Sequence, residues 1–441
     1  MSLFLVKQAS RAKGGIALLG DKSIASRSVI ISALSQGKTT IKNFPPNEDC
    51  LYAVKTFRKL GIKIIQNKNA GRITVYGKGL YGLRKPKGPI FTGDSGTVFR
   101  LTLGVLAGQD FPVTLTAGKS LSQRPMLRVT SPLRMMGAVI KSKKQKSKSE
   151  EYPPVTVKGA CLNSIIYKMP VASAQVKSSI LLAGLYAKGQ TCVIEPIKTR
   201  DHTERMLKLF RAGIQTKAGK IIIKGRRGLI SPGEFSIPGD ISSAAFFMVL
   251  GAILPNSRIL MKGVNLNSSR TGILDVLKRM GLDIEIRKPK SKNRIYEPMG
   301  DLIIRSSRLK GTIVKKEEVP VLIDELPILM VAACFAEGKS VFEGISELRV
   351  KETDRAESMT QNLAKMGADI KVLKTPKSEK IIIQGCNPLR GASVRSFGDH
   401  RTAMSMVVAG LAAKGVTRID DVTCINKSFP NFLSLLKSII R

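Results

Sequence analysis

The sequence contains no tryptophan and only two histidines, and aromatic residues make up 5% of its 441 positions. Few aromatic rings leave little surface on which the bases of single-stranded nucleic acid could stack, which disfavours a single-strand-binding protein. The histidines, His202 and His400, lie far apart, and no His, Cys and Asp residues cluster at the spacing of metal ligands. We therefore expect no bound metal.

Cysteines and long apolar runs are also scarce. The six cysteines are widely separated, with no C-x-x-C pair, so neither a zinc site nor a disulfide framework is indicated. No apolar run reaches the roughly 18 residues of a membrane span, and the longest covers residues 326–336. The apolar stretch at residues 3–6 is shorter than the roughly seven residues that a secretory signal needs. We expect a cytoplasmic protein with no membrane partner.

Acidic residues are few as well, because 32 Asp and Glu against 73 Lys and Arg give a formal net charge of +41. Much of this excess lies in three segments between expected strands, residues 141–148, 287–294 and 371–380. A nucleic-acid patch is one interpretation. We favour the other, solvated hairpin ends whose charge discourages edge-to-edge pairing of strands. The mean hydropathy of +0.03 is nevertheless ordinary for a globular protein with packed cores.

The chain has an internal repeat. An apolar helical stretch, a short turn and a β-like run recur six times, at intervals close to one sixth of the length. A second series of helices ends on a hydrophobic residue and a glycine, the usual helix C-cap, and two alternating strands follow most of them. Each unit therefore has the predicted order β-α-β-α-β-β. The turns of the first series lie at Gly37, Gly108, Gly189, Pro255, Gly338 and Gly415.

A segment rich in proline and glycine, residues 231–239, divides the six units three and three. The sixth unit stops after its second helix, whereas residues 3–7 and 15–19 resemble two further strands. We expect these N-terminal strands to complete the last unit. The sequence thus predicts an α/β protein of two lobes, residues 21–238 for the first and residues 1–20 with 239–441 for the second.

A polar loop precedes each of the six long apolar helices. A helix N-terminus offers unpaired N–H groups and a partial positive charge to anions. Ser, Thr and Asp in any single loop would be ordinary N-caps. Six equivalent ends, several with Lys or Arg, favour an anion-binding site. The loops are residues 20–27, 92–100, 173–178, 239–243, 324–327 and 398–402.

Two further segments carry charges at informative positions. Lys351 and Arg355, spaced i and i+4, would share one helix face with Glu352 beside them, and spacing alone favours a surface helix with salt bridges. Arg124 precedes a proline, which favours an extended backbone from which the side chain can reach across a cleft. A solvated loop arginine is the alternative for Arg124.

Together these segments resemble the 5-enolpyruvylshikimate-3-phosphate (EPSP) synthase family. Eight short motifs follow in order over nearly the whole chain, and the ordered set is far more specific than any one motif. They are Gly-Asp-Lys-Ser-x-x-x-Arg (20–27), Gly-x-Ser-Gly-Thr (93–97), Ser-x-Arg-Pro-Met (122–126), Val-Ala-Ser-Ala-Gln-Val-Lys-Ser (171–178), Thr-Arg-Asp-His-Thr-Glu (199–204), Arg-Val-Lys-Glu-Thr-Asp-Arg (349–355), Asp-His-Arg (399–401) and Ser-Phe-Pro (428–430).

The resemblance implies a two-domain inside-out α/β barrel with three β-α-β-α-β-β units per domain. It also implies a 3-phosphoshikimate 1-carboxyvinyltransferase of the shikimate pathway, which leads to chorismate and the aromatic amino acids. Such an enzyme transfers the enolpyruvyl group of phosphoenolpyruvate to the 5-hydroxyl of shikimate 3-phosphate and releases phosphate. Both substrates are small polyanions, which Lys and Arg suit. The family needs no metal or organic cofactor, because these cations neutralise the leaving phosphate. We expect a monomer.

The resemblance also implies roles for individual residues. Asp324 would accept the proton of the 5-hydroxyl, Glu352 would protonate the methylene carbon of phosphoenolpyruvate, and Lys22 is the third catalytic candidate. Phosphoenolpyruvate would bind to Lys22, Gly96, Thr97, Arg124, Gln175, Arg355, Arg401 and Lys427. Shikimate 3-phosphate would bind to Lys22, Ser23, Arg27, Ser173, Ala174, Gln175, Arg200, Asp324 and Lys351.

The first two motifs depart from the family pattern at a few positions. Leu19 stands where Pro is usual, and Ala25-Ser26 where Ser-His is usual, but both leave Lys22, Ser23 and Arg27 in register. Asp94 stands where Asn is usual. A carboxylate near an anionic substrate repels it unless a neighbouring group compensates its charge.

Two alternative functions remain open. UDP-N-acetylglucosamine enolpyruvyl transferase shares the fold and the phosphoenolpyruvate chemistry, but it relies on a cysteine in the loop that here covers residues 116–120. No cysteine lies between Cys50 and Cys161, which disfavours this alternative. The other is a basic nucleic-acid-binding protein on the same scaffold, which salt-dependent retention on heparin would support.

Overall fold

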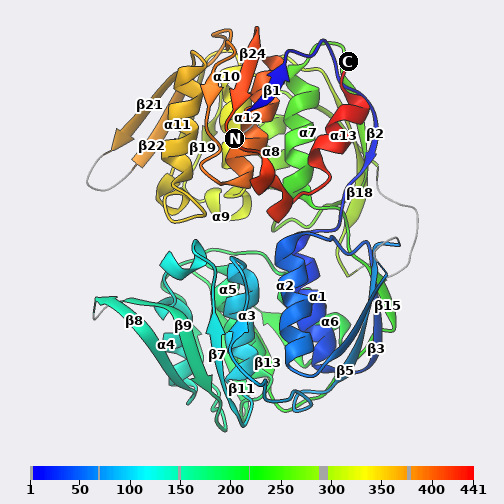
Figure 1. The fold of residues 1–441 in the computed structure, drawn as a ribbon, viewed down its shortest axis with the longest axis vertical. Helices are drawn as coiled ribbons and strands as arrows, with labels where there is room; N and C mark the ends of the chain where they lie inside the picture. The colour runs from blue at the N-terminus through cyan, green and yellow to red at the C-terminus, as the bar shows by residue number, and fades with distance from the viewer. Residues whose placement is uncertain (1–2, 68–69, 148–149, 218, 288–295, 375–378) are drawn as a thin grey trace. The chain divides into compact units, whose positions relative to one another are not determined.

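The computed structural model describes all residues except 1–2, 68–69, 148–149, 218, 288–295 and 375–378, so parts of the three basic segments lie outside the described residues. The chain divides into two compact units. Figure 1 shows the chain coloured by residue number, from blue at the N-terminus to red at the C-terminus. The first unit is Gly20–Ile237, and the second is Met1–Leu19 together with Pro238–Arg441. In the part of the chain that is described, no helix has both the length and the apolar character to cross a membrane.

Three mixed sheets form the outer layer of the first unit, with orders β14-β3-β5-β4, β6-β7-β9-β8 and β10-β11-β13-β12, and β15 also pairs with β3. In each sheet a short edge strand is parallel to its neighbour and the other pairs are antiparallel. The strands are β3 (Ser35–Lys42), β4 (Lys63–Asn67), β5 (Arg72–Lys78), β6 (Ile90–Phe91), β7 (Pro112–Thr116), β8 (Val139–Ser147), β9 (Glu150–Lys158), β10 (Ile166–Lys168), β11 (Gln190–Ile194), β12 (Ile214–Lys217), β13 (Lys220–Lys224), β14 (Leu229–Ile230) and β15 (Glu234–Ser236).

Two kinds of helix accompany these sheets. Helices α1 (Lys22–Ala33), α3 (Gly96–Leu106) and α5 (Ala174–Gly184) are buried along most of their length, because apolar or small residues occur on every face. Helices α2 (Glu48–Lys59), α4 (Leu127–Met135) and α6 (His202–Leu209) are amphipathic and pack one face inward. A short 3₁₀ helix, η1 (Leu121–Gln123), precedes α4.

The second unit repeats this plan, with sheet orders β17-β18-β16-β2, β19-β20-β22-β21 and β1-β24-β23. Its buried helices are α7 (Ile241–Ile253), α10 (Leu326–Cys334) and α12 (His400–Ala412), which pack against one another. The other helices are α8 (Gly272–Arg279), α9 (Val319–Leu322), α11 (Arg355–Lys365), α13 (Phe432–Ile439) and the 3₁₀ helices η2 (Ile345–Leu348) and η3 (Thr423–Lys427). The strands are β1 (Phe4–Lys7), β2 (Lys13–Ala17), β16 (Arg258–Asn265), β17 (Asp283–Arg287), β18 (Met299–Arg305), β19 (Ile313–Val314), β20 (Lys339–Glu343), β21 (Asp369–Lys374), β22 (Glu379–Gln384), β23 (Ser393–Val394) and β24 (Val416–Ile419).

The N-terminal strands are shared between two sheets. β1 pairs with β24, the last strand of the chain, but β2 pairs in parallel with β16. The expectation that both strands complete the last unit is therefore wrong for β2. The physical reason lies just before α7, where β14 and β15 pair with β3 of the first unit. Because β14 and β15 pair with β3, they do not fill the edge position beside β16. β2 occupies that position, parallel to β16.

Glycines after the amphipathic helices end them as expected. Gly61 follows α2 with φ 86° and Gly367 follows α11 with φ 91°, in the left-handed region where a Cβ is disfavoured. The exception follows α6, where Arg211 has φ 61° and Gly213 has no positive φ. α6 is thus followed by the β12–β13 hairpin although the residue with positive φ after it is Arg211 and not a glycine.

Candidate active site

Four of the eight motifs lie at the N-terminal ends of buried helices: residues 20–27 at α1, 93–97 at α3, 171–178 at α5 and 399–401 at α12. Five of these helices are capped by a side-chain oxygen that accepts a backbone N–H of the first turn; the caps are Asp21, Ser95, Ser173, Asp240 and Asp399. The later residues of three expected loops, 20–27, 92–100 and 173–178, are helical instead. α1 begins at Lys22, α3 at Gly96 and α5 at Ala174.

In the first unit, three motifs meet through Gln175. Its amide nitrogen donates to the Thr97 hydroxyl at 3.1 Å, and its amide oxygen accepts from Arg100 at 2.5 Å. Arg100 also donates to the backbone oxygen of Pro125 at 3.2 Å, next to Arg124. Arg100 ends the second of the polar loops expected from the sequence, where no role was assigned to it, but it lies inside α3.

Arg27 joins three helices. Its guanidinium is buried and donates to the Thr203 hydroxyl at 2.7 Å, to the Ser178 hydroxyl at 3.0 Å and to the Ser23 backbone oxygen at 2.9 Å. These bonds link α1 with α5 and α6. Because a guanidinium has five N–H groups, at most two remain for a ligand. The hydrogen bonds of Arg27 therefore hold α1, α5 and α6 together.

Lys22 faces Asp49 at the start of α2, with 2.9 Å between the ammonium nitrogen and the carboxylate. Both side chains are partly accessible to solvent. An anionic ligand at Lys22 would compete with Asp49, which the sequence analysis did not identify.

Arg124 has the extended backbone that Pro125 predicts, with φ −97° and ψ 140°. Its guanidinium donates to the Ser120 hydroxyl at 3.2 Å. Asp94 accepts the Leu121 backbone N–H at 2.9 Å and so holds the 3₁₀ turn that leads to Arg124. The carboxylate at this unusual position is thus directed toward a backbone donor, which partly compensates its charge.

In the second unit, Arg355 is the centre of a group of charged side chains. It is 1% exposed and contacts three carboxylates: Asp399 at 3.0 Å, Asp324 at 3.3 Å and Glu352. Burial alone would raise the pKa of Asp399, but the Arg355 guanidinium, His400 and the Thr402 backbone N–H together outweigh it and hold the pKa below its ordinary value. The buried cation is thus matched by more than one anion.

Asp324 lies between two guanidinium groups. Besides Arg355, its carboxylate is 3.5 Å from the Arg401 Nε, and its backbone oxygen accepts from Arg401 at 2.8 Å. Asp324 could have been only the N-cap of α10. Glu325 instead occupies the N-cap position, and no side-chain cap forms there. The Asp324 side chain is 19% exposed, so a small molecule can reach it.

Lys351 and Glu352 lie in the turn before α11, which begins at Arg355. The suggestion that Lys351 and Arg355 share a helix face is therefore wrong. Asp354 is the N-cap and accepts the Glu357 backbone N–H at 3.0 Å, so its extended backbone separates the turn from the helix. Burial lowers the pKa of Lys351 below 10.5, although Asp324 opposes that shift.

Lys427 ends η3 and is held in place by the core beside it. Phe429, two residues later, packs edge-on against Phe247 of α7 with 6.1 Å between ring centroids. The Lys427 ammonium has no ion-pair partner within the described ranges, so it remains open to an anionic ligand.

A buried ionic group behind Asp324 was also missed. Arg270 is 3.7 Å from the Glu325 carboxylate and 3.6 Å from that of Asp240, and the Ser242 hydroxyl donates to Glu325. These contacts tie the start of α10 to the start of α7. Nothing in the local pattern around Arg270 signals partners so far along the chain.

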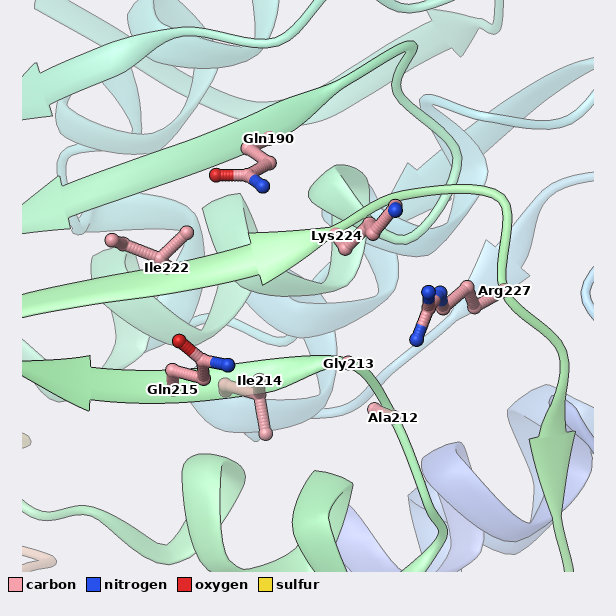
Figure 2. Close-up of a pocket in the computed structure, with 8 residues that line it drawn as sticks. All are labelled: Gln190, Ala212, Gly213, Ile214, Gln215, Ile222, Lys224 and Arg227. Atoms are coloured by element: carbon pink, nitrogen blue, oxygen red, sulfur yellow. The ribbon is translucent and has the colours of Figure 1, made fainter.

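Other features do not coincide with the predicted residues. Over the described residues, no three His, Cys, Asp or Glu side chains are grouped so that they could hold a metal ion. Figure 2 shows a pocket on the β11, β12 and β13 sheet of the first unit, with none of the predicted residues in its lining. Its lining residues are Gln190, Ala212, Gly213, Ile214, Gln215, Ile222, Lys224 and Arg227.

Known proteins match this chain along its whole length. The family model for EPSP synthase (3-phosphoshikimate 1-carboxyvinyltransferase) matches residues 6–436. The 3-phosphoshikimate 1-carboxyvinyltransferase of Desulforamulus reducens is 46% identical over 436 residues, which cover 99% of each chain. That of Geotalea uraniireducens is 45% identical over 440 residues, or 100% of each chain.

A solved EPSP synthase from Acinetobacter baumannii superposes with a TM-score of 0.86 at 40% identity, covering 99% of this chain and 98% of the other. This likeness, together with the six sheets, confirms the predicted fold class. The chain therefore belongs to the EPSP synthase family.

Proposed function

We propose that the charged residues described in each unit are the substrate-binding and catalytic residues of this enzyme. As a family member, the chain transfers the enolpyruvyl group of phosphoenolpyruvate to the 5-hydroxyl of shikimate 3-phosphate and releases phosphate, a step of aromatic amino-acid biosynthesis. The observation that carries the residue assignment is the Asp324 carboxylate, accessible and flanked by Arg355 and Arg401 with Glu352 nearby.

In the proposed mechanism, Asp324 accepts the proton of the 5-hydroxyl as the oxygen attacks C2 of phosphoenolpyruvate, and Glu352 protonates the C3 methylene carbon. A tetrahedral adduct results. An anionic ligand at Arg355 and Arg401 competes with Asp324 for these guanidinium groups, which makes the carboxylate a stronger base. In the second step, phosphate leaves C2 and the methyl carbon loses a proton, as acid and base exchange roles.

Cationic side chains support both steps. Lys and Arg near the leaving phosphate stabilise the charge that develops on it. We assign Arg355, Arg401 and Lys427 to phosphoenolpyruvate, together with Lys22, Gly96, Thr97, Arg124 and Gln175. We assign Ser23, Arg27, Ser173, Ala174, Arg200 and Lys351 to shikimate 3-phosphate, together with Lys22, Gln175 and Asp324. We also propose that the enzyme is a cytoplasmic monomer and that the two compact units are its lobes.

Phosphate release in the presence of both substrates tests the function directly. Omission of either substrate should abolish the signal, and UDP-N-acetylglucosamine should not replace shikimate 3-phosphate. Absence of phosphate release by folded protein with both substrates would contradict the assignment. Tight, salt-dependent heparin binding in that inactive protein would then favour the nucleic-acid alternative.

Chelation should leave the activity intact. Because Lys and Arg neutralise the leaving phosphate in the proposed mechanism, we expect the rate after dialysis against EDTA to equal that of untreated enzyme. The measurement is steady-state phosphate release before and after dialysis. A loss of rate that added Mg²⁺ or Zn²⁺ restores would refute this prediction.

The affinity for shikimate 3-phosphate should depend on pH through Lys351. Burial lowers the pKa of Lys351, so its ammonium loses its proton, and its attraction for the anionic substrate, at a lower pH than an exposed lysine would. We expect the KM for shikimate 3-phosphate to rise as pH passes that lowered pKa. In Lys351→Arg the rise should disappear, because a guanidinium stays charged throughout. Superimposable KM profiles of the two enzymes between pH 7 and pH 10 would contradict the assignment.

A further inference from the structure

A buried group of three charges lies beside Arg200 in the first unit. Lys177 of α5 is 1% exposed, and its ammonium is 2.9 Å from Glu195 and 2.7 Å from Glu204. Glu195 directly follows β11, and Glu204 lies in α6. Both carboxylates are nearly inaccessible to solvent. Burying charges costs desolvation energy, so such a group is weak evidence for a contribution to stability.

The two glutamates differ in what else they hold. One oxygen of Glu195 contacts Lys177, and the other accepts both the backbone N–H of Thr199, at 3.1 Å, and its hydroxyl. In contrast, the second oxygen of Glu204 has no hydrogen-bond partner among the residues described. Only Glu195 therefore connects Lys177 to the loop between β11 and α6.

This connection fixes the chain immediately before Arg200. Thr199 is 3% exposed, and its two bonds to Glu195 close the loop on itself. On the other side of Arg200, Asp201 pairs with Arg205 at 2.9 Å, and Thr203 accepts a hydrogen bond from Arg27. The backbone of Arg200 is thus held from both directions.

We propose that Glu195, oriented by Lys177, is a positioning residue that holds Arg200 in place to bind shikimate 3-phosphate. The proposal rests on the substrate role assigned to Arg200 above. A side chain held in its binding geometry before the ligand arrives loses less freedom on binding. Without the connection, the backbone before Arg200 is less constrained and the substrate must supply more of its ordering, so affinity falls while the chemistry of the bound complex is unchanged.

Glu195→Met and Glu204→Met form a matched pair. Each removes one carboxylate from Lys177 and keeps a side chain of similar length, but only Glu195→Met also releases Thr199. We expect Glu195→Met to raise the KM for shikimate 3-phosphate by about tenfold or more, with kcat and the KM for phosphoenolpyruvate within twofold of wild type. Glu204→Met should lower the melting temperature to a similar extent and leave both KM values unchanged.

Thr199→Val is a milder variant that keeps all three charges. It removes the hydroxyl and retains the backbone N–H, so we expect a smaller rise in the KM for shikimate 3-phosphate. It also serves if Glu195→Met does not fold. Hydrogen exchange of the amides of residues 197–200 should be faster in Glu195→Met or Thr199→Val than in Glu204→Met.

The outcomes separate the positioning role from the function of Arg200. If Arg200→Met leaves the KM for shikimate 3-phosphate unchanged, the substrate role of Arg200 is wrong and the proposal fails with it. If Arg200→Met raises this KM but the Glu195, Thr199 and Glu204 variants all behave alike, only the positioning role is overturned. Support requires a KM effect of Glu195→Met that disappears when Arg200 is already methionine.

Discussion

Asp324→Asn should lower kcat by about two to four orders of magnitude, the usual scale for loss of a general base. Asparagine is close to aspartate in size and can still accept hydrogen bonds from Arg355 and Arg401, but its amide cannot take up the hydroxyl proton. The melting temperature should remain near that of wild type, because Arg355 keeps its contacts with Asp399 and Glu352. Binding of shikimate 3-phosphate should largely survive.

The measurement is steady-state phosphate release at saturating substrates, with thermal melting and equilibrium binding of shikimate 3-phosphate on the same preparations. Asp283→Asn is the matched control, since Asp283 also pairs with an arginine, Arg305, at 3.1 Å but is largely exposed on β17. It should turn over like wild type. An Asp324→Asn enzyme that melts normally and works within a few-fold of wild type would exclude Asp324 as the base and make Glu352 the first candidate.

The architecture could be predicted because its signals are local. Helices that are apolar on every face, each with a polar loop before it and a turn after it, recur six times, and that repetition predicts buried helices packed against sheets. The placement of β2 is different in kind. β2 pairs with β16, so that Lys13 lies opposite Arg258. The sheet that receives such an edge strand depends on which edge positions distant segments leave open.

The same distinction applies to the charged residues. The local motifs contain Lys22, Arg124 and Arg355, and the polar loop at residues 324–327 contains Asp324. Their roles as substrate ligands or catalytic groups remain predictions. The contacts of Arg100 with Gln175 and of Arg270 with Glu325 could not be predicted, because the partners come from different repeat units. Where a local signal existed, it could be missed: Asp354 and Glu357 have the spacing of a helix capping box, which indicates that α11 begins after Lys351 rather than before it.

Arg355→Met should have the largest effect on stability. It leaves Asp399, Glu352 and Asp324 without their shared cation, and Asp399 is fully buried. Removing one partner of a buried ion pair typically costs about 3–5 kcal/mol in the free energy of unfolding. Turnover should fall below detection, since Arg355 is also assigned to phosphoenolpyruvate. Arg287→Met, which breaks the exposed pair with Glu285, is the control and should cost less than about 1 kcal/mol.

The cost of Arg355→Met should depend on pH in a defined direction. In wild type the pKa of Asp399 is lower in the folded protein than in the unfolded chain. The ionised carboxylate therefore stabilises the fold at any pH above the unfolded pKa, and this stabilisation is lost only as pH falls through the folded pKa. Without Arg355, burial is opposed far less and should raise the pKa of Asp399 above the unfolded value. The folded variant then binds a proton that its unfolded chain does not, so its stability relative to wild type improves as pH falls. Urea unfolding at pH 5 and pH 8 measures this difference. An equal cost at both pH values, with Arg355→Lys no better than Arg355→Met, would show that Arg355 acts by packing rather than by its charge.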